Sequence, residues 1–151
     1  MGLFNFFKKP IKIQDPVFGE LNLTAFRERS KDFFTGEGYF NKENPKVGFI
    51  IHAESAGPAE AQYTFYKKLQ EDYPALIEKM IPLITDEFLN WKEDFRILDF
   101  NTEFKMDSVT IPNQAMQPMV WDICFTTIHD KNHWVTVNFL DAEPDFVMVD
   151  G

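Results

Sequence analysis

The stretch from Gly57 to Trp91 constrains the fold more than any other part of the chain, because it is the only long segment with helical periodicity. Pro58 and Glu60 are typical of a first helical turn, where a proline loses no needed N–H and a carboxylate meets the positive end of the helix dipole. Apolar residues then recur at steps of three, four and one, at Tyr63, Tyr66, Leu69, Tyr73, Leu76, Ile77, Met80, Ile84 and Phe88. This spacing predicts a helix that covers a core with one apolar stripe.

Two prolines interrupt the helical stripe. Pro74 follows Asp72 and Tyr73, so that one helix can end and another begin there. Pro82 lies inside the pattern, where it removes a backbone donor and either kinks or ends a helix. We therefore expect a bent helical unit in two or three pieces.

Segments with strand patterns precede the helical block. Residues 20–23 alternate between apolar and polar, and Val47–His52 is a compact apolar run that predicts a well-buried strand. Between them, Phe33–Phe40 carries Gly36 and Gly38, which favours a hairpin or a bulge.

Further strand patterns follow the helical block. Phe104–Pro112 predicts a strand in which the apolar side changes near Asp107, whereas Lys92–Glu103 fits either a helix end or a strand. The last third of the chain predicts three strands, at Met119–His129, His133–Leu140 and Asp145–Val149.

The predicted pairing of the first two C-terminal strands matters for chemistry. Their apolar faces coincide only if the numbers of paired residues sum to an even number, because a one-residue slip inverts a strand. Pairing Phe125 with Val137 leaves a three-residue loop and sets His129 opposite His133, roughly 5 Å apart at their β-carbons. Pairing Phe125 with Phe139 separates the two histidines.

A metal site at this hairpin is therefore one hypothesis. In the first register both imidazoles of His129 and His133 can reach one ion, with Asp130 or Asp122 as a third ligand. The alternative is a polar hairpin tip with no metal. Because the sequence does not identify either aspartate as a definite third ligand, we expect no cofactor. Metal binding by His129 and His133 stays the alternative hypothesis.

The sequence holds two other candidates for chemistry, Ser55 and Cys124. Ser55 lies between a predicted strand and a predicted helix, as the serine of a nucleophile elbow does, and His52 and His129 are available bases. The chain is short for an α/β-hydrolase and lacks alternating strands and helices, so a turn or capping role is favoured. Cys124 shows no neighbouring base and is interpreted as a structural thiol.

Length and composition bound the architecture. The chain has 151 residues, enough for one domain with a real core, and its 17 phenylalanines predict an aromatic-rich core. We expect a short N-terminal arm over residues 1–10 and a single domain over residues 11–151. The predicted fold is α+β: an antiparallel β-sheet built from N- and C-terminal meanders, with the central bent helical unit packed on one face.

Charge and cysteine content narrow the classes of function. The net charge of −9 argues against nucleic acid as a partner and favours a basic protein surface. One cysteine excludes an internal disulfide and a cysteine-based zinc cluster. The sequence has neither a transmembrane segment nor a signal-peptide pattern, so we expect a cytoplasmic protein. Phe4, Phe6 and Phe7 suggest a lipid-surface role as a third hypothesis.

The remaining signal is aromatic. Trp91, Trp134 and Tyr39 are the candidate binding residues, because such side chains dominate protein interfaces when they are exposed. Together with the acidity and the lack of a catalytic constellation, they favour a non-enzymatic protein-binding function, with a homodimer left open. The alternative is a metal-binding or hydrolytic protein that uses His129 and His133, or Ser55.

The overall plan also resembles a family of small uncharacterised bacterial α+β domains. The resemblance rests on Asp15-Pro16-Val17-Phe18-Gly19-Glu20-Leu21, on the central helical block, and on His133-Trp134-Val135-Thr136-Val137-Asn138-Phe139-Leu140-Asp141 with a final Val149-Asp150-Gly151. Trp134 departs from the small residue expected after His133. No activity is assigned to such domains. Some resemble, in size and acidity, immunity proteins that neutralise toxins. The resemblance supports the α+β plan more than any function, and an immunity-type role is the specific form of protein binding that it suggests.

Overall fold

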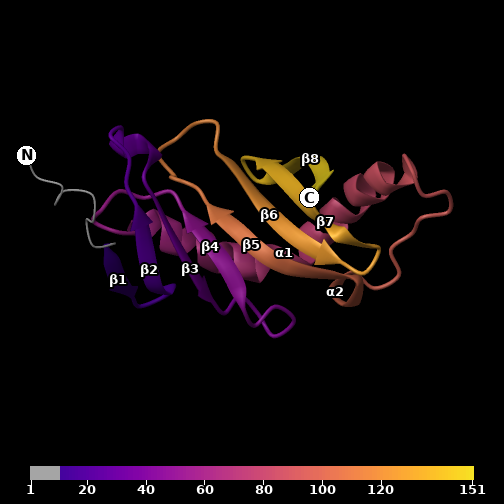
Figure 1. The fold of residues 1–151 in the computed structure, drawn as a ribbon, viewed down its shortest axis with the longest axis horizontal. Helices are drawn as coiled ribbons and strands as arrows, with labels where there is room; N and C mark the ends of the chain where they lie inside the picture. The colour runs from indigo at the N-terminus through magenta and orange to yellow at the C-terminus, as the bar shows by residue number, and fades with distance from the viewer. Residues whose placement is uncertain (1–10) are drawn as a thin grey trace, which may run out of the picture.

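Eight strands form one sheet in the order in which they occur along the chain (Figure 1). The computed structural model describes residues 11–151; the expected arm over residues 1–10, with its proposed lipid contact, lies outside them. The strands are β1 Lys12–Asp15, β2 Gly19–Thr24, β3 Phe33–Gly38, β4 Val47–Ile51, β5 Phe104–Ile111, β6 Val120–Thr127, β7 Asp130–Leu140 and β8 Glu143–Asp150. The helices are α1 Glu60–Leu89, the short α2 Phe100–Glu103 and a 3-10 turn at Arg29–Lys31.

The sheet consists of two antiparallel halves joined by one parallel pair. Strands β1 to β4 pair antiparallel, as do β5 to β8, whereas β4 and β5 run parallel. Parallel neighbours need a long crossover connection, and α1 supplies it. These features confirm the α+β class and the mostly antiparallel sheet, and they add a parallel junction that the sequence analysis did not predict.

The expectation of two or three helical pieces is wrong, because α1 is one helix of 30 residues that contains both Pro74 and Pro82. Its path in Figure 1 is not straight, as prolines inside a helix require. Leu69, Tyr73 and Met80 are buried on either side of Pro74, so burial continues through the point where the backbone hydrogen bonding is weakened. Tertiary packing therefore outweighs the local cost of the prolines.

Gln62 fixes the beginning of α1 to the sheet. Its Oε1 accepts from the N–H of Ala59, and its Nε2 donates to the carbonyl oxygens of His52 and Pro112 at 3.1 Å each. Those two residues directly follow the parallel strands β4 and β5. The helix begins at Glu60, two residues later than the expected start at Pro58.

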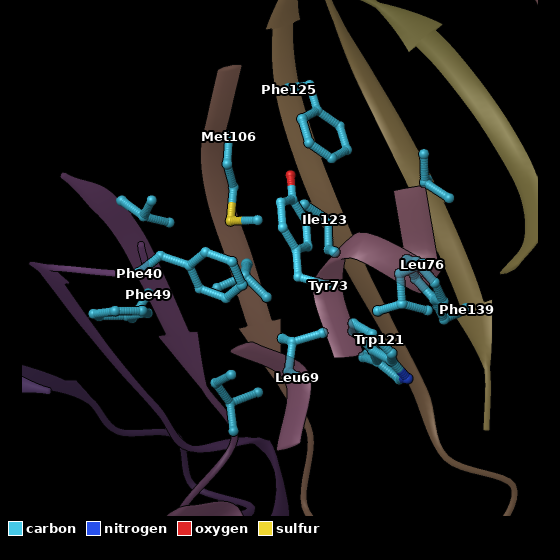
Figure 2. Close-up of a cluster of buried hydrophobic side chains, with 14 of the residues drawn as sticks. Phe40, Phe49, Leu69, Tyr73, Leu76, Met106, Trp121, Ile123, Phe125 and Phe139 are labelled. Carbon is cyan, nitrogen blue, oxygen red and sulfur yellow. The ribbon is translucent and has the colours of Figure 1, made fainter. Parts of the chain in front are cut away.

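The core contains buried side chains of α1 together with side chains that alternate inward along the strands. Ring contacts join Tyr66 to Phe49, Phe65 to Trp121 and Phe88 to Phe104. Figure 2 shows Leu69, Tyr73 and Leu76 of α1 among side chains of the strands. The cluster of buried residues contains Phe18, Phe34, Phe40, Phe49, Phe88, Phe100, Phe104, Phe125 and Phe139. This confirms the aromatic-rich core.

Several local predictions have clear outcomes. The strand at residues 20–23 and the buried strand predicted at Val47–His52, observed at Val47–Ile51, are confirmed. The change of the apolar side near Asp107 is also confirmed, since the β5–β6 register shifts between Met106 and Ser108. Residues 33–38 form a regular strand, so a hairpin or bulge there was wrong. Residues 92–99 form neither helix nor strand, and α2 follows them.

The β6–β7 register differs from both registers considered. Phe125 pairs with Val135, Ile123 with Val137 and Trp121 with Phe139. The numbers of paired residues sum to an even number, as predicted. The pairing itself is shifted by two residues from the favoured register, which set Phe125 opposite Val137. A register shift between Phe125 and Thr127 accompanies a two-residue turn, Ile128-His129, in place of the expected three-residue loop.

Candidate functional site

The two histidines of the proposed metal site each pair with a different carboxylate. His129 lies in the β6–β7 turn, and its Nε2 is 2.9 Å from Oε1 of Glu103. His133 lies on β7, with its Nδ1 2.8 Å from Oδ2 of Asp130. The opposed arrangement of the histidines was therefore wrong, because it depended on a register that the sheet does not adopt.

A metal centre has no geometric support within residues 11–151, where no group of three or more His, Cys, Asp or Glu is arranged to hold an ion. The His129 ring instead packs edge-on against Phe95, with ring centroids 4.8 Å apart. Metal binding by the histidine pair stays a prediction that rests on sequence alone.

Glu103 organises the segment that precedes it. Its Oε2 accepts from the backbone N–H groups of Leu98 and Asp99, at 2.8 and 2.5 Å, while Oε1 faces His129. Burial alone raises the pKa of this carboxyl, but the hydrogen bonds from Asp99, His129 and Leu98 outweigh it and hold the pKa below its ordinary value. The arrangement is that of a structural cap.

The other two candidates for chemistry also have structural surroundings. Ser55 is exposed in the turn between β4 and α1. Of its two candidate bases, His129 forms a hydrogen bond with Glu103 through Nε2. Cys124 lies on β6 opposite Thr136. Burial is the main cause that raises the pKa of the Cys124 thiol, so it stays protonated at neutral pH. Cys124 therefore lacks the lowered pKa of a catalytic thiolate, whereas the hydrolytic hypothesis for Ser55 stays a prediction.

The three aromatic residues proposed for binding are all exposed, but on different elements. Tyr39 directly follows β3 and is 60% exposed, whereas Trp91 follows α1 and packs against Phe88. Trp134 lies on β7 and is 46% exposed. Of the three, Trp134 belongs to a sheet face that carries further large apolar side chains.

The C-terminal strands carry an exposed apolar surface on the face turned away from the core. It consists of five side chains that are 43% to 59% exposed, Val120, Trp134, Leu140, Phe146 and Met148, which we call the C-terminal apolar surface. Strand pairing sets Val120 opposite Leu140, and it sets Met148 and Phe146 opposite Thr136 and Asn138 of β7. The intervening residues Val135, Val137 and Phe139 point to the core and are at most 1% exposed.

The C-terminal segment that carries this surface is strongly acidic. Residues 119–151 contain one lysine, Lys131, against six acidic residues, Asp122, Asp130, Asp141, Glu143, Asp145 and Asp150. Glu143 pairs with Lys79 of α1 at 2.7 Å. Within the described part of the chain, no ion pair involves Asp145 or Asp150. The segment that carries the surface thus combines exposed apolar side chains with an excess of negative charge.

Most members of this surface were missed in the sequence analysis. The signal lies in Phe146-Val147-Met148-Val149, a strand with apolar residues on both sides. Such a strand is either buried on both faces or exposes apolar residues on one of them. Choosing between these outcomes requires knowledge of what covers each face.

No family model, curated protein or solved structure matches this chain. The resemblance to small bacterial domains and to immunity proteins therefore stays a prediction. Neither described helix combines the length and the apolar character of a membrane span.

Proposed function

We propose that this protein is a non-enzymatic binding protein whose interface is the C-terminal apolar surface. The observation that carries the proposal is the gathering of five large apolar side chains, each at least 43% exposed, on one sheet face. Single exposed apolar residues are ordinary, but contiguous ones mark interaction sites. Trp134, Phe146 and Met148 belong to the residue types that are enriched at interfaces, so they are the proposed anchors.

We also infer that α1 packs on the core face alone and leaves this outer face open. The ring contacts of α1 support this inference, since Phe65 meets Trp121 and Tyr66 meets Phe49, both of which point inward. An antiparallel sheet is stable with one face solvated when that face is polar. Here β8 and both ends of β7 expose large apolar side chains on the outer face, with the polar Thr136 and Asn138 between them, and this exposure favours a partner rather than water.

The charge around the surface favours a basic partner. Six acidic residues against one lysine in residues 119–151 attract a basic protein and accelerate its association. The same charge disfavours a second copy of this chain, because a twofold contact would bring like charges together. An inhibitor of a basic protein, as immunity proteins are, is the specific form of function that we propose.

The proposal is tested by gentle purification of the tagged chain from its host, followed by native mass spectrometry. The expected result is a complex with a basic protein that the Phe146→Ser variant loses. A matched control is Leu98→Ser, since Leu98 is also exposed, at 78%, but lies outside the surface. Complex formation should weaken at high salt, as steering between opposite charges requires.

Three outcomes would contradict the proposal. Phe146→Ser can leave the complex unchanged, or Leu98→Ser can abolish it equally; either result would place the interface elsewhere. A mass of twice the chain, with no other protein bound, would show that the surface serves self-association. Both variants should unfold at nearly the wild-type urea concentration, because exposed substitutions change stability by about 0.5 kcal/mol or less.

A further inference from the structure

We propose that a cavity between α1 and the beginning of β6 binds a small aromatic amine. The cavity has a volume of about 210 Å³. Its walls come from α1, from the start of β6 and from the β7–β8 turn, and its apolar lining residues are Phe65, Leu69, Leu76, Met119 and Trp121. It shares no residue with the C-terminal apolar surface, so this inference is independent of the proposed function.

The floor of the cavity is held in place before any ligand arrives. The Trp121 ring stacks on Phe139 with centroids 4.0 Å apart, and Phe65 meets it edge-on at 5.0 Å. The indole Nε1 donates to the carbonyl oxygen of Asp141 at 2.7 Å. Figure 2 shows Trp121 beside Phe139, with Leu69 and Leu76 of α1 nearby. Because its only donor is used, Trp121 offers the ligand an apolar ring surface.

The size of the cavity selects a single ring. An engineered apolar cavity of about 150 Å³ in another protein holds benzene, so 210 Å³ accommodates one aromatic ring with a short substituent. Drug-sized ligands need pockets of roughly 300 Å³ or more. Leu69 and Leu76 of α1 line the cavity and are each at most 8% exposed, so they contribute fixed apolar walls for such a ring.

The charged residues at the mouth of the cavity favour a cationic substituent on the aromatic ring. Lys68 pairs with Asp72 at 2.6 Å, and these two charges cancel. Asp141 also lines the cavity and adds a negative charge, and the whole chain carries a net charge of −9. An ammonium group on a short chain therefore meets a net negative charge at this mouth, that of Asp141, whereas an anionic group is repelled. The aromatic walls favour a cation as well, through their ring quadrupoles.

Three probes with the same ring separate the effects of shape and charge. We would titrate 2-phenylethylamine, 2-phenylethanol and 3-phenylpropanoate and follow the indole N–H signals by NMR. Exposed Trp91 and Trp134, the other two of the three tryptophans, serve as internal controls. The amine is expected to shift the Trp121 signal with a dissociation constant of roughly 1 mM, typical of a ligand of this size. The alcohol is expected to bind about fivefold more weakly, and the anion more weakly again.

A substitution at the mouth tests the charge part of the proposal. Asp72→Asn removes a carboxylate and releases Lys68, so it should weaken binding of the amine by roughly fivefold and strengthen that of 3-phenylpropanoate. Asp86→Asn is the matched control, since Asp86 is likewise an exposed aspartate of α1 but does not line the cavity. Equal effects of the two variants would overturn the role of the mouth.

A second substitution tests the cavity itself without disturbing the core. Ala142 is exposed and lines the mouth, so Ala142→Phe places a ring over the entrance and should abolish the Trp121 shift. Ala115→Phe, at an exposed loop position outside the cavity, should leave the shift intact. Absence of any Trp121 shift with all three probes at roughly 10 mM would overturn the site, and equal binding of the three would overturn the ligand class.

Discussion

Tyr63 on α1 donates a hydrogen bond from its hydroxyl to the Asp15 carboxylate, 2.5 Å away. The other carboxylate oxygen of Asp15 accepts from the backbone N–H groups of Val17 and Phe18, both at 2.8 Å. The turn after these residues ends at Gly19, whose φ of +77° suits glycine. One buried side chain thus shapes the β1–β2 turn and ties it to the helix, which explains why an Asp-Pro-x-x-Gly sequence stands there.

Tyr63→Phe should lower the free energy of unfolding by about 1.5 to 3 kcal/mol, because it removes a hydrogen bond to a charged and mostly buried acceptor. Urea denaturation followed by circular dichroism measures the change. Tyr39→Phe is the control. The Tyr39 side chain is 60% exposed, so the loss of its hydroxyl should leave the free energy of unfolding unchanged. Equal stability of the two variants would show that the Asp15 contact contributes nothing.

The hydrogen bond between Tyr63 and Asp15 also predicts a loss of stability at alkaline pH. Burial, followed by the hydrogen bond and the charge of Asp15, raises the pKa of Tyr63 from 10.0 to about 12. A raised folded-state pKa gives stability that is complete below pH 10 and is lost as the pH rises through about 12, because only the unfolded chain ionises in between. The stability difference between wild type and Tyr63→Phe should therefore shrink from pH 9 to pH 12 in urea titrations. A constant difference would contradict this assignment.

The helical block shows how much of the fold the sequence determines locally. The stripe that includes Tyr66, Leu69 and Met80 correctly predicted one buried helical face, because burial follows helical periodicity. The interruption at Pro74 was wrong, because a local penalty of about 3 kcal/mol is offset by apolar contacts on both sides. Such contacts come from strands distant in sequence and cannot be deduced from the helix.

The β6–β7 hairpin shows a different limit. Alternation requires paired numbers with an even sum, but it does not separate registers that differ by two residues. Asn132 suggested a turn at residues 130–132, whereas the chain turns at Ile128 and His129. The candidate site depended on this choice, because a shift of two residues moved His129 away from His133 and toward Glu103. Exposure of Phe146 and Met148 was likewise not predictable without the arrangement of the whole sheet.

The observed register can be tested with the single native cysteine. Cys124 lies directly opposite Thr136, so Thr136→Cys should form a disulfide with it on mild oxidation. Asn138→Cys is the control, since the register that pairs Phe125 with Val137 would instead set residue 138 opposite Cys124. Mass spectrometry of proteolytic fragments would identify the bond, and a disulfide formed by the residue 138 variant alone would refute the observed register.

Gln62 should be the most sensitive polar position of α1. Gln62→Ala would leave the Ala59 N–H and the His52 carbonyl oxygen without their partner, and the Pro112 carbonyl oxygen with Gln114 as its remaining donor, at a cost of about 2 to 3 kcal/mol in the free energy of unfolding. Glu71→Ala, at an exposed site of the same helix, should change it by about 0.5 kcal/mol or less. Thermal unfolding followed at 222 nm measures both variants, and similar melting temperatures would show that Gln62 does not fix the helix start.

The hydrogen bonds of Glu103 predict a loss of stability in acid, which is separate from the alkaline loss expected for Tyr63. Its pKa lies below the ordinary value of 4.5, because the hydrogen bonds from Asp99, His129 and Leu98 outweigh the effect of burial. A lowered folded-state pKa gives stability that is present above pH 4.5 and is lost as the pH falls through the folded-state pKa, because the unfolded chain binds the proton first. Glu103→Gln should cost about 2 kcal/mol at pH 7, and the difference from wild type should shrink below pH 4.5.

Glu78→Gln supplies the control for this acid prediction, since Glu78 is exposed on α1 and its replacement should matter little at any pH. Urea midpoints at pH 7, 5, 4 and 3 measure the three proteins side by side. A difference between wild type and Glu103→Gln that stays near zero from pH 7 down to pH 3 would mean that the negative charge of Glu103 is not what stabilises residues 98 and 99. In that case the cap would depend on the shape of the side chain, which glutamine shares, and the pH dependence of unfolding would arise from other carboxylates.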